Sequence, residues 1–489
     1  MREPDDEVQE ALITPAEMES AILEGLAAQP IESWMTWLHP DQAPYVRRSY
    51  NGPVRIRGAA GTGKTVLGLH RAAWIASTRP GRVLVTSYVH TLPKALKAQY
   101  GRLSPQTADR VDFRSAHQFA LDLLRERGTP LTPEKAAINA AYRAAWAEVG
   151  KPGLLKRLPV DWEYWKDEIA NVIKGRAIFE FEDYARLERV GRRFRLGVEQ
   201  RLAVWHLLIA YQQQLQARGV HDFADVFIYA EHALRTGPVP PYTAVVVDEV
   251  QDLPCVALRM FHHLVQDRPD GLLLIGDGQQ SIYPGGFTLR EAGIDVRGRA
   301  VVMRHNYRNT EEILAAARTI VSGDAFGDLD DLEEVGDREI IATRRGAPPV
   351  SQVLPDVASH EAAFLAAVRH ALDGGARVAD IAVLVPTNPM TERYVDQLNA
   401  VGIPAVSLKS YDGRPTDCVK VGTYHRSKGM EFPHVFLPQA ARPKPQRRDE
   451  TEDAYRERVE LDRRTLFVAM TRARDTLWVG HVAAAVRGV

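Results

Sequence analysis

The amino-acid sequence predicts an α/β protein with two sheet-containing lobes, the first of which carries an all-α insertion. Strand-like apolar runs alternate with helical patterns from residue 54 onward, an alternation typical of a parallel sheet. Residues from about 117 to 220 are instead rich in Ala, Leu, Arg and Trp and contain no convincing strand run. A second set of apolar runs follows Asn306, so we expect a second α/β lobe.

The chain is expected to begin with a helical extension over residues 1–37. Five apolar residues of this segment share one helical face: Met18, Ile22, Leu23, Leu26 and Ala27. The first lobe should then comprise residues 38–116 and 221–298, on either side of the insertion at 117–220. Its strands and first helix are expected at 54–57, 65–76, 83–86, 244–250 and 272–277.

The second lobe is expected over residues 299–489. Its apolar runs lie at 382–387, 419–424, 434–438 and 476–482, and the segment 441–464 reads as a charge-dense linker that enters a solvated helix.

Composition narrows the classes of function. The 62 basic and 63 acidic side chains almost cancel, which excludes a uniformly basic coat and leaves a local groove as the place for any nucleic acid. Two cysteines far apart, Cys255 and Cys418, disfavour disulfide frameworks, zinc sites and iron–sulfur clusters. The acidic start without an apolar core, and the lack of about 18 uninterrupted apolar residues anywhere, predict a cytoplasmic protein without a membrane partner.

Residues 58–65, GAAGTGKT, match the phosphate-binding pattern G-x4-GK[ST] between an expected strand and an expected helix. Gly58, Gly61 and Gly63 allow backbone N–H groups to curl around a phosphate at a helix N-terminus. Lys64 would neutralise the β- and γ-phosphate oxygens, and the hydroxyl of Thr65 would bind magnesium. The pattern therefore predicts ATP and Mg²⁺ as cofactors.

An acidic pair, Asp248 and Glu249, follows the apolar run 244–247. Carboxylates at the C-terminal end of a parallel strand lie on the same sheet edge as the phosphate loop. We expect Asp248 to hold magnesium through water, and Glu249 to orient and deprotonate the attacking water.

Several further segments occur in an order that resembles the successive motifs of UvrD/Rep-type superfamily 1 helicases. They are DEVQD at 248–252, GDGQQSIY at 276–283, NYRN at 306–309, TYHRSKGMEF at 423–432 and LFVAMTRA at 466–473. LHPDQ at 38–42 and DFAD at 222–225 resemble shorter motifs of the same family. The resemblance implies two RecA-like P-loop NTPase lobes with ATP bound between them.

The resemblance also implies roles for single residues around the nucleotide. Gln42 would read the adenine and Tyr307 would stack on it, while Glu431 would accept a hydrogen bond from the ribose. Gln280 would sense the γ-phosphate, and Arg308 and Arg472 would reach it from the second lobe. Val66 departs from the family, which often has an arginine there, and Gly278 and Gln279 stand where acidic residues are common.

A track for nucleic acid is implied by residues of aromatic, imidazole and ammonium type, because bases stack on aromatic rings and phosphates attract cations. The candidates are Tyr88, His117, Tyr283, Phe287, His425 and Lys428. The ordinary alternatives are a core aromatic for Tyr88, a helix-start residue for His117 and an exposed lysine for Lys428. The expected partner is single-stranded DNA or a junction of single and double strands.

The sequence thus predicts an ATP-dependent translocase or helicase, with 3′ to 5′ polarity on the resemblance alone. The alternative is an NTPase switch that gates a partner in a larger repair or anti-phage complex. No metal-binding nuclease pattern is visible, so a nuclease would be a separate chain. Only 113 residues separate NYRN from TYHRSKGMEF, which leaves little room for a second-lobe insertion and predicts feeble unwinding.

Overall fold

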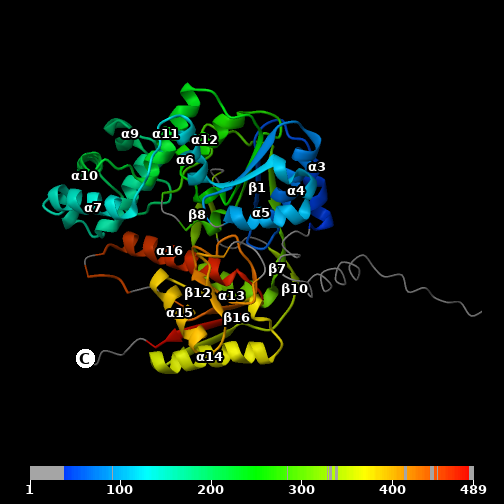
Figure 1. Ribbon diagram of the computed structural model, residues 1–489. Helices are drawn as coiled ribbons and strands as arrows, with labels where there is room; N and C mark the ends of the chain where they lie inside the picture. The colour runs from blue at the N-terminus through cyan, green and yellow to red at the C-terminus, as the bar shows by residue number, and fades with distance from the viewer. Residues whose placement is uncertain are drawn as a thin grey trace, which may run out of the picture.

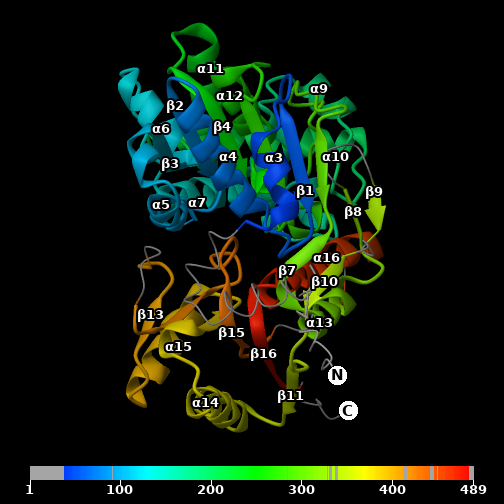
Figure 2. The ribbon, with the colours of Figure 1, turned by 90° about the vertical axis from the view of Figure 1, so that its right-hand side faces the viewer.

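The computed structural model describes residues 38–90, 92–282, 285–327, 329, 333–335, 340–411, 416–440, 445–448 and 450–483. The expected extension over 1–37 lies outside these residues. Two six-stranded sheets dominate the fold, one above the other, with a group of helices beside the upper one (Figures 1 and 2).

The first sheet is wholly parallel and has the strand order β3-β2-β4-β5-β1-β6. Its strands are β1 Val54–Gly58, β2 Arg82–Ser87, β3 Val111–Ser115, β4 Tyr242–Asp248, β5 Leu272–Gly276 and β6 Ala300–Met303. Successive side chains of a strand point to opposite faces, so β4 places Val245 and Val247 in one core and Ala244 and Val246 in the other. Helices α3 Ala43–Arg47, α4 Lys64–Thr78 and α5 Leu92–Leu103 contribute to the second of these cores; α6 Ala116–Glu126, α11 Phe223–Thr236 and α12 Cys255–Val265 contribute to the first.

Two expected boundaries of the first lobe differ from the structure. Strand β6 pairs with β1, Ile56 opposite Val301, so by sheet membership the first lobe runs to residue 303 and not to 298. Helix α6 was expected in the insertion, yet its Phe119 and Leu123 are buried in a core of the first lobe. Composition alone misplaced α6 because it resembles the helices of the insertion in residue type.

The insertion has a core of its own, formed by α7 Lys135–Ala145, α8 Trp162–Asp167, α9 Phe181–Arg186 and α10 Val198–Ala217. Two stretches of π-helix, Trp146–Gly150 and Glu168–Ile173, continue α7 and α8. Trp165 is fully buried at the centre and Trp162 packs at its edge. Both tryptophans therefore contribute to the core of the insertion.

The second sheet is also parallel throughout, in the order β11-β16-β15-β12-β14-β13. Its strands are β11 Val350–Leu354, β12 Ile381–Val385, β13 Ala405–Ser407, β14 Val419–Thr423, β15 Phe432–Leu437 and β16 Ala473–Val482, and its helices are α13 Glu311–Val321, α14 Val357–Asp373, α15 Asn388–Ala400 and α16 Glu452–Met470. Two small ladders join β7 His305–Thr310 to β10 Ile341–Arg344 and β8 Ala325–Gly327 to β9 Glu333–Val335. Between residues 310 and 422 the described chain is taken up by these elements, with no further helical domain among them.

Every helix in the described part of the chain is too short or too polar to cross a bilayer. Over the same residues, no group of three or more His, Cys, Asp or Glu side chains is arranged to hold a metal ion.

Candidate nucleotide and nucleic-acid site

The phosphate loop connects β1 to α4 in a conformation that only glycine adopts without strain. Gly61 and Gly63 have φ values of +75° and +77°, in the left-handed region. A Cβ on Gly61 would come within 2.5 Å of the Asn306 side chain. The ammonium of Lys64 donates to the carbonyls of Gly58 and Ala59, both at 2.7 Å, and burial lowers its pKa to about 8.

The acidic pair lies on the sheet edge expected for it. The Thr65 hydroxyl donates to Asp248 Oδ2 at 2.9 Å. Burial, together with the neighbouring Glu249, raises the pKa of Asp248 to about 7. Burial would also raise the pKa of Glu249, but the cations around it, Lys428 first, outweigh that effect and lower it. Glu249 is therefore ionised beside a hydroxyl–carboxylate pair.

The second lobe completes the pocket with two arginines and a glutamate. Arg308, Glu431 and Arg472 line the same pocket as Lys64 and Glu249. Arg472 is buried and donates to Gln280 Oε1 at 3.0 Å, which joins the lobes across the pocket. Arg308 and Glu431 form an ion pair with each other.

The adenine-reading candidates lie beside the phosphate loop. Gln42 Nε2 donates to the Thr62 carbonyl at 2.9 Å. The Tyr307 ring stacks on His39, with centroids 4.2 Å apart and planes at 22°. We had not singled out His39, although it belongs to the LHPDQ segment. Both rings are buried, and stacking of a base on Tyr307 stays a prediction.

Three amide side chains that sequence reasoning passed over organise this site. Asn306 Nδ2 donates to the Ala60 carbonyl of the phosphate loop at 2.8 Å, and Asn309 Nδ2 donates to the Thr471 carbonyl at 3.1 Å. Gln251 Nε2 donates to Glu249 Oε2 at 2.6 Å. The signal was present, because both asparagines flank Tyr307–Arg308 in NYRN and Gln251 lies in DEVQD.

A groove of about 530 Å³ lies between the lobes, and two of the residues predicted to contact nucleic acid line it. Tyr88 follows β2 in the first lobe, and exposed His425 follows β14 in the second; both line the groove. His117 packs behind Tyr88, with ring centroids 5.5 Å apart, and its burial lowers its pKa to about 4. Contact of these residues with nucleic acid stays a prediction.

Two strand-contact predictions are wrong. Phe287 is only 3% exposed, because its ring packs in the core of the first lobe with Leu289. Lys428 has no exposed surface and pairs with Asp252 at 2.7 Å, so it cannot contact a strand phosphate. Tyr283 lies outside the described residues.

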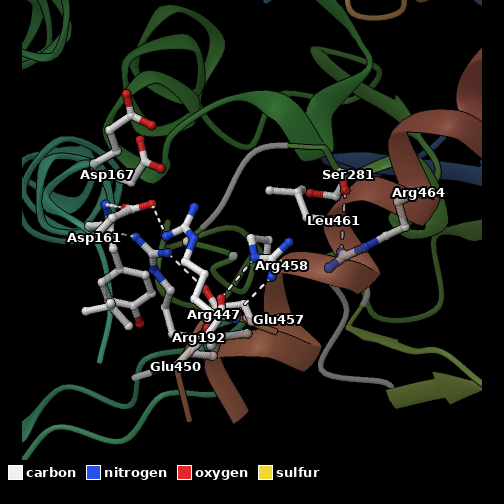
Figure 3. Close-up of a pocket in the computed structure, with 18 residues that line it drawn as sticks. Asp161, Asp167, Arg192, Ser281, Arg447, Glu450, Glu457, Arg458, Leu461 and Arg464 are labelled. Atoms are coloured by element: carbon white, nitrogen blue, oxygen red, sulfur yellow. Dashed lines mark hydrogen bonds and ion pairs between the residues drawn. The ribbon is translucent and has the colours of Figure 1, made fainter. Parts of the chain in front are cut away.

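A second cavity, of about 310 Å³, lies where the insertion meets α16 (Figure 3). Ion pairs border it: Arg192 lies 2.9 Å from Glu457, and Arg447 lies 2.7 Å from Asp161. Beside them Arg193 pairs with Glu460 at 2.8 Å. We call these three pairs the insertion clasp, since they hold the insertion against the second lobe.

Comparison with known proteins supports the family resemblance. The model of the UvrD/REP helicase N-terminal domain matches residues 38–294, and that of the UvrD-like helicase C-terminal domain matches residues 407–483. The chain is 25% identical over 406 residues to the ATP-dependent DNA helicase UvrD1 of Mycobacterium tuberculosis, covering 77% of this chain and 50% of that protein. It is 22% identical over 395 residues to the ATP-dependent DNA helicase PcrA of Bacillus subtilis, covering 76% and 50%.

The chain thus spans about half the length of the curated relatives it matches. The order of motifs, the pocket between two parallel sheets and the two family matches agree. Because the N-terminal match alone covers more than half of the residues, the chain belongs to the UvrD/REP helicase family.

Proposed function

We propose that this chain is an ATP-dependent DNA translocase or helicase that hydrolyses ATP between its two RecA-like lobes. One observation carries the proposal: Lys64 and Glu249 of the first lobe line one pocket with Arg308 and Arg472 of the second. A pocket with contributions from both lobes responds to their closure, so a change at the nucleotide is coupled to their relative movement.

The residues present fit a magnesium ion. Thr65 and Asp248 supply a hydroxyl and a carboxylate 2.9 Å apart, and Mg²⁺ prefers oxygen ligands while keeping several waters and phosphate oxygens. When bound, the ion would neutralise charge on the phosphates. Lys64 binds the β- and γ-phosphate oxygens, Glu249 takes the proton of the attacking water, and Arg308 and Arg472 stabilise the charge on the transferred group.

The nucleic-acid partner we propose is single-stranded DNA, lying in the groove lined by Tyr88 and His425. The name of the M. tuberculosis relative, an ATP-dependent DNA helicase, supports DNA over RNA. The 3′ to 5′ polarity comes from the family resemblance. A nuclease or other protein that acts together with this chain would be a separate subunit.

ATPase activity of the purified chain, measured with and without oligo-dT, tests the first part. We expect magnesium-dependent hydrolysis that single strands stimulate. Glu249→Gln should lose turnover by several orders of magnitude yet still bind nucleotide, because it removes the base and leaves the phosphate cradle. Hydrolysis by this variant at a near wild-type rate would remove Glu249 from its assigned role.

Displacement of streptavidin from end-biotinylated oligonucleotides tests movement and polarity. Motion from 3′ to 5′ should clear streptavidin from the 5′ end and leave the 3′ end occupied, and Lys64→Ala should clear neither. ATP hydrolysis at the same rate with and without DNA would favour the NTPase switch instead.

A further inference from the structure

One turn of the second lobe, residues 423–431, borders both the groove and the nucleotide pocket. Thr423, His425 and Arg426 line the groove. Gly429 and Glu431, a few residues later, line the pocket. Two backbone hydrogen bonds of 3.0 Å to the Thr423 carbonyl keep the turn compact. A shift at its groove end is therefore transmitted to its pocket end.

Lys428 lies between these two parts and points into the first lobe. Its ammonium donates to Asp252 Oδ1 at 2.8 Å and to the carbonyl of Gln280. Glu249 Oε2 lies 3.7 Å from the same ammonium. All three partners belong to the first lobe, so a cation of the second lobe is inserted beside the carboxylate that activates water.

Glu249 is also restrained by its own lobe, at the same carboxylate oxygen that lies near Lys428. Gln251 Nε2 donates to Glu249 Oε2 at 2.6 Å, while Gln251 Oε1 accepts from the backbone N–H of Asp277 at 3.1 Å. Glu249 thus has one restraint that is fixed in the first lobe, Gln251, and one that moves with the turn, Lys428.

We propose that Lys428 is a positioning residue that couples strand binding in the groove to the placement of Glu249. The inference rests on the proposed function and adds to it the route between the two sites. A strand that presses on the turn at His425 moves Lys428, and Lys428 moves relative to Glu249.

The burial of Lys428 keeps it beside the carboxylates of the first lobe. A fully buried ammonium cannot be left without a carboxylate partner except at a large cost, so a movement of the turn changes its distances to Asp252 and Glu249 rather than releasing it. Coulomb attraction varies inversely with distance, so the pull of Lys428 on Glu249 depends on where the turn lies.

Steady-state ATPase kinetics on the full chain test the proposal, with Lys428→Met as the principal variant. Methionine keeps the unbranched shape and removes the charge. We measure kcat and KM for ATP with and without saturating oligo-dT, and the Kd for oligo-dT by fluorescence anisotropy. Lys409→Met, at an exposed lysine of the same lobe, is the matched control.

We expect Lys428→Met to lower the stimulation ratio, kcat with DNA over kcat without, by about tenfold or more, which reports a lost transition-state coupling. KM for ATP and Kd for oligo-dT should stay within about threefold of the wild-type values. Lys428→Arg should recover part of the ratio, since it keeps a cation opposite Asp252. Lys409→Met should match the wild type.

The double variant Lys428→Met/Asp252→Leu covers the case in which the single variant fails to fold, because replacing both members of a buried pair by apolar groups is often tolerated. An unchanged stimulation ratio in either variant would overturn the proposal. The proposal would also be overturned if KM for ATP and Kd for oligo-dT both rose while the stimulation ratio stayed the same. That result would indicate a purely structural ion pair. A wild-type chain that DNA does not stimulate would instead refute the proposed function, and this inference with it.

Discussion

Arg472 is the most enclosed cation of the nucleotide pocket. It is 1% exposed, and burial lowers its pKa to about 10, so it remains charged at neutral pH. Its guanidinium donates to the Val468 carbonyl at 2.8 Å as well as to Gln280. The side chain is thus held in place before any nucleotide binds.

We expect Arg308→Ala and Arg472→Ala each to lower kcat for ATP on the order of 10³-fold or more, as for other arginines that stabilise a transferring phosphoryl group. Nucleotide affinity, measured by titration with a fluorescent ATP analogue, should change much less. Losses of similar size in affinity and turnover would assign the arginine a structural role. Thermal melting of Arg472→Ala is the necessary control, because this variant leaves buried acceptors without a donor.

At the scale of residues, the sequence predicts a position well where the chemistry of the site requires one residue type. It does not predict whether a given side chain is buried. Gly63 has a left-handed backbone and Thr65 donates to Asp248, and the spacing of the G-x4-GK[ST] pattern was enough to pick out both residues. Lysine and phenylalanine can contact a nucleic-acid strand as readily as they can be buried. Nothing local in the sequence shows that Lys428 and Phe287 are in fact buried.

At the scale of elements, α16 is more than the solvated helix that its charge predicted. Two of its glutamates, Glu457 and Glu460, belong to the insertion clasp, and its Ala454 packs into the core of the insertion. A run of alternating charge is typical of an exposed face. Here the opposite charges lie on another part of the chain, about 265 residues away, where sequence spacing cannot show them.

Reversing one charge of the clasp should detach the insertion from α16. Arg193→Glu sets like charges against Glu460, and adding Glu460→Arg should restore the contact. Energy transfer between dyes at Gln213→Cys on α10 and Arg369→Cys on α14, in a Cys418→Ser background, reports the separation. Transfer should fall in the single variant and recover in the double one.

Arg456→Glu is the matched control, because Arg456 pairs with Glu452 of the same helix and not with the insertion. High salt should move the wild type towards the single variant, since partly exposed pairs are screened. Equal transfer in all variants would show that apolar packing at Ala454 holds the insertion without the clasp.

The pattern of burial also explains which strands could be predicted. Strands β4 and β5 are buried almost throughout and stood out as apolar runs. Strands β3 and β6 lie at the two edges of the first sheet, and their burial is partial or alternating. Their short mixed sequences carried too little apolar signal to be recognised.

At the scale of the whole molecule, the second lobe has no helical insertion of its own over the described part of residues 310–422. The family resemblance implies that larger members place there a domain that contacts duplex. We therefore expect single-strand-stimulated translocation with feeble unwinding. A strand-displacement assay on long duplexes, run beside the streptavidin assay, measures both. Efficient unwinding by the isolated chain would show that such a domain is dispensable.

The connection between the lobes lies at one edge of the first sheet, where it would act as an off-centre pivot. Strand β6 ends in the first sheet at Met303 and β7 begins at His305, so Arg304 alone separates the two. Strand β1, which leads into the phosphate loop, is one strand away from β6, whereas β2, which leads to Tyr88, is four strands away.

Neighbouring strands of a sheet lie about 4.8 Å apart, so β1 and β2 lie about 5 Å and about 19 Å from β6. A rotation of about 10° around the pivot would then sweep about 0.8 Å at the phosphate loop but about 3.3 Å at Tyr88. The second value is close to the roughly 3.4 Å that each nucleotide of one strand advances along the axis of a DNA helix. A rotation about this edge of the sheet would thus turn a sub-ångström rearrangement at the nucleotide into a displacement at the groove that is comparable with the axial rise of one nucleotide.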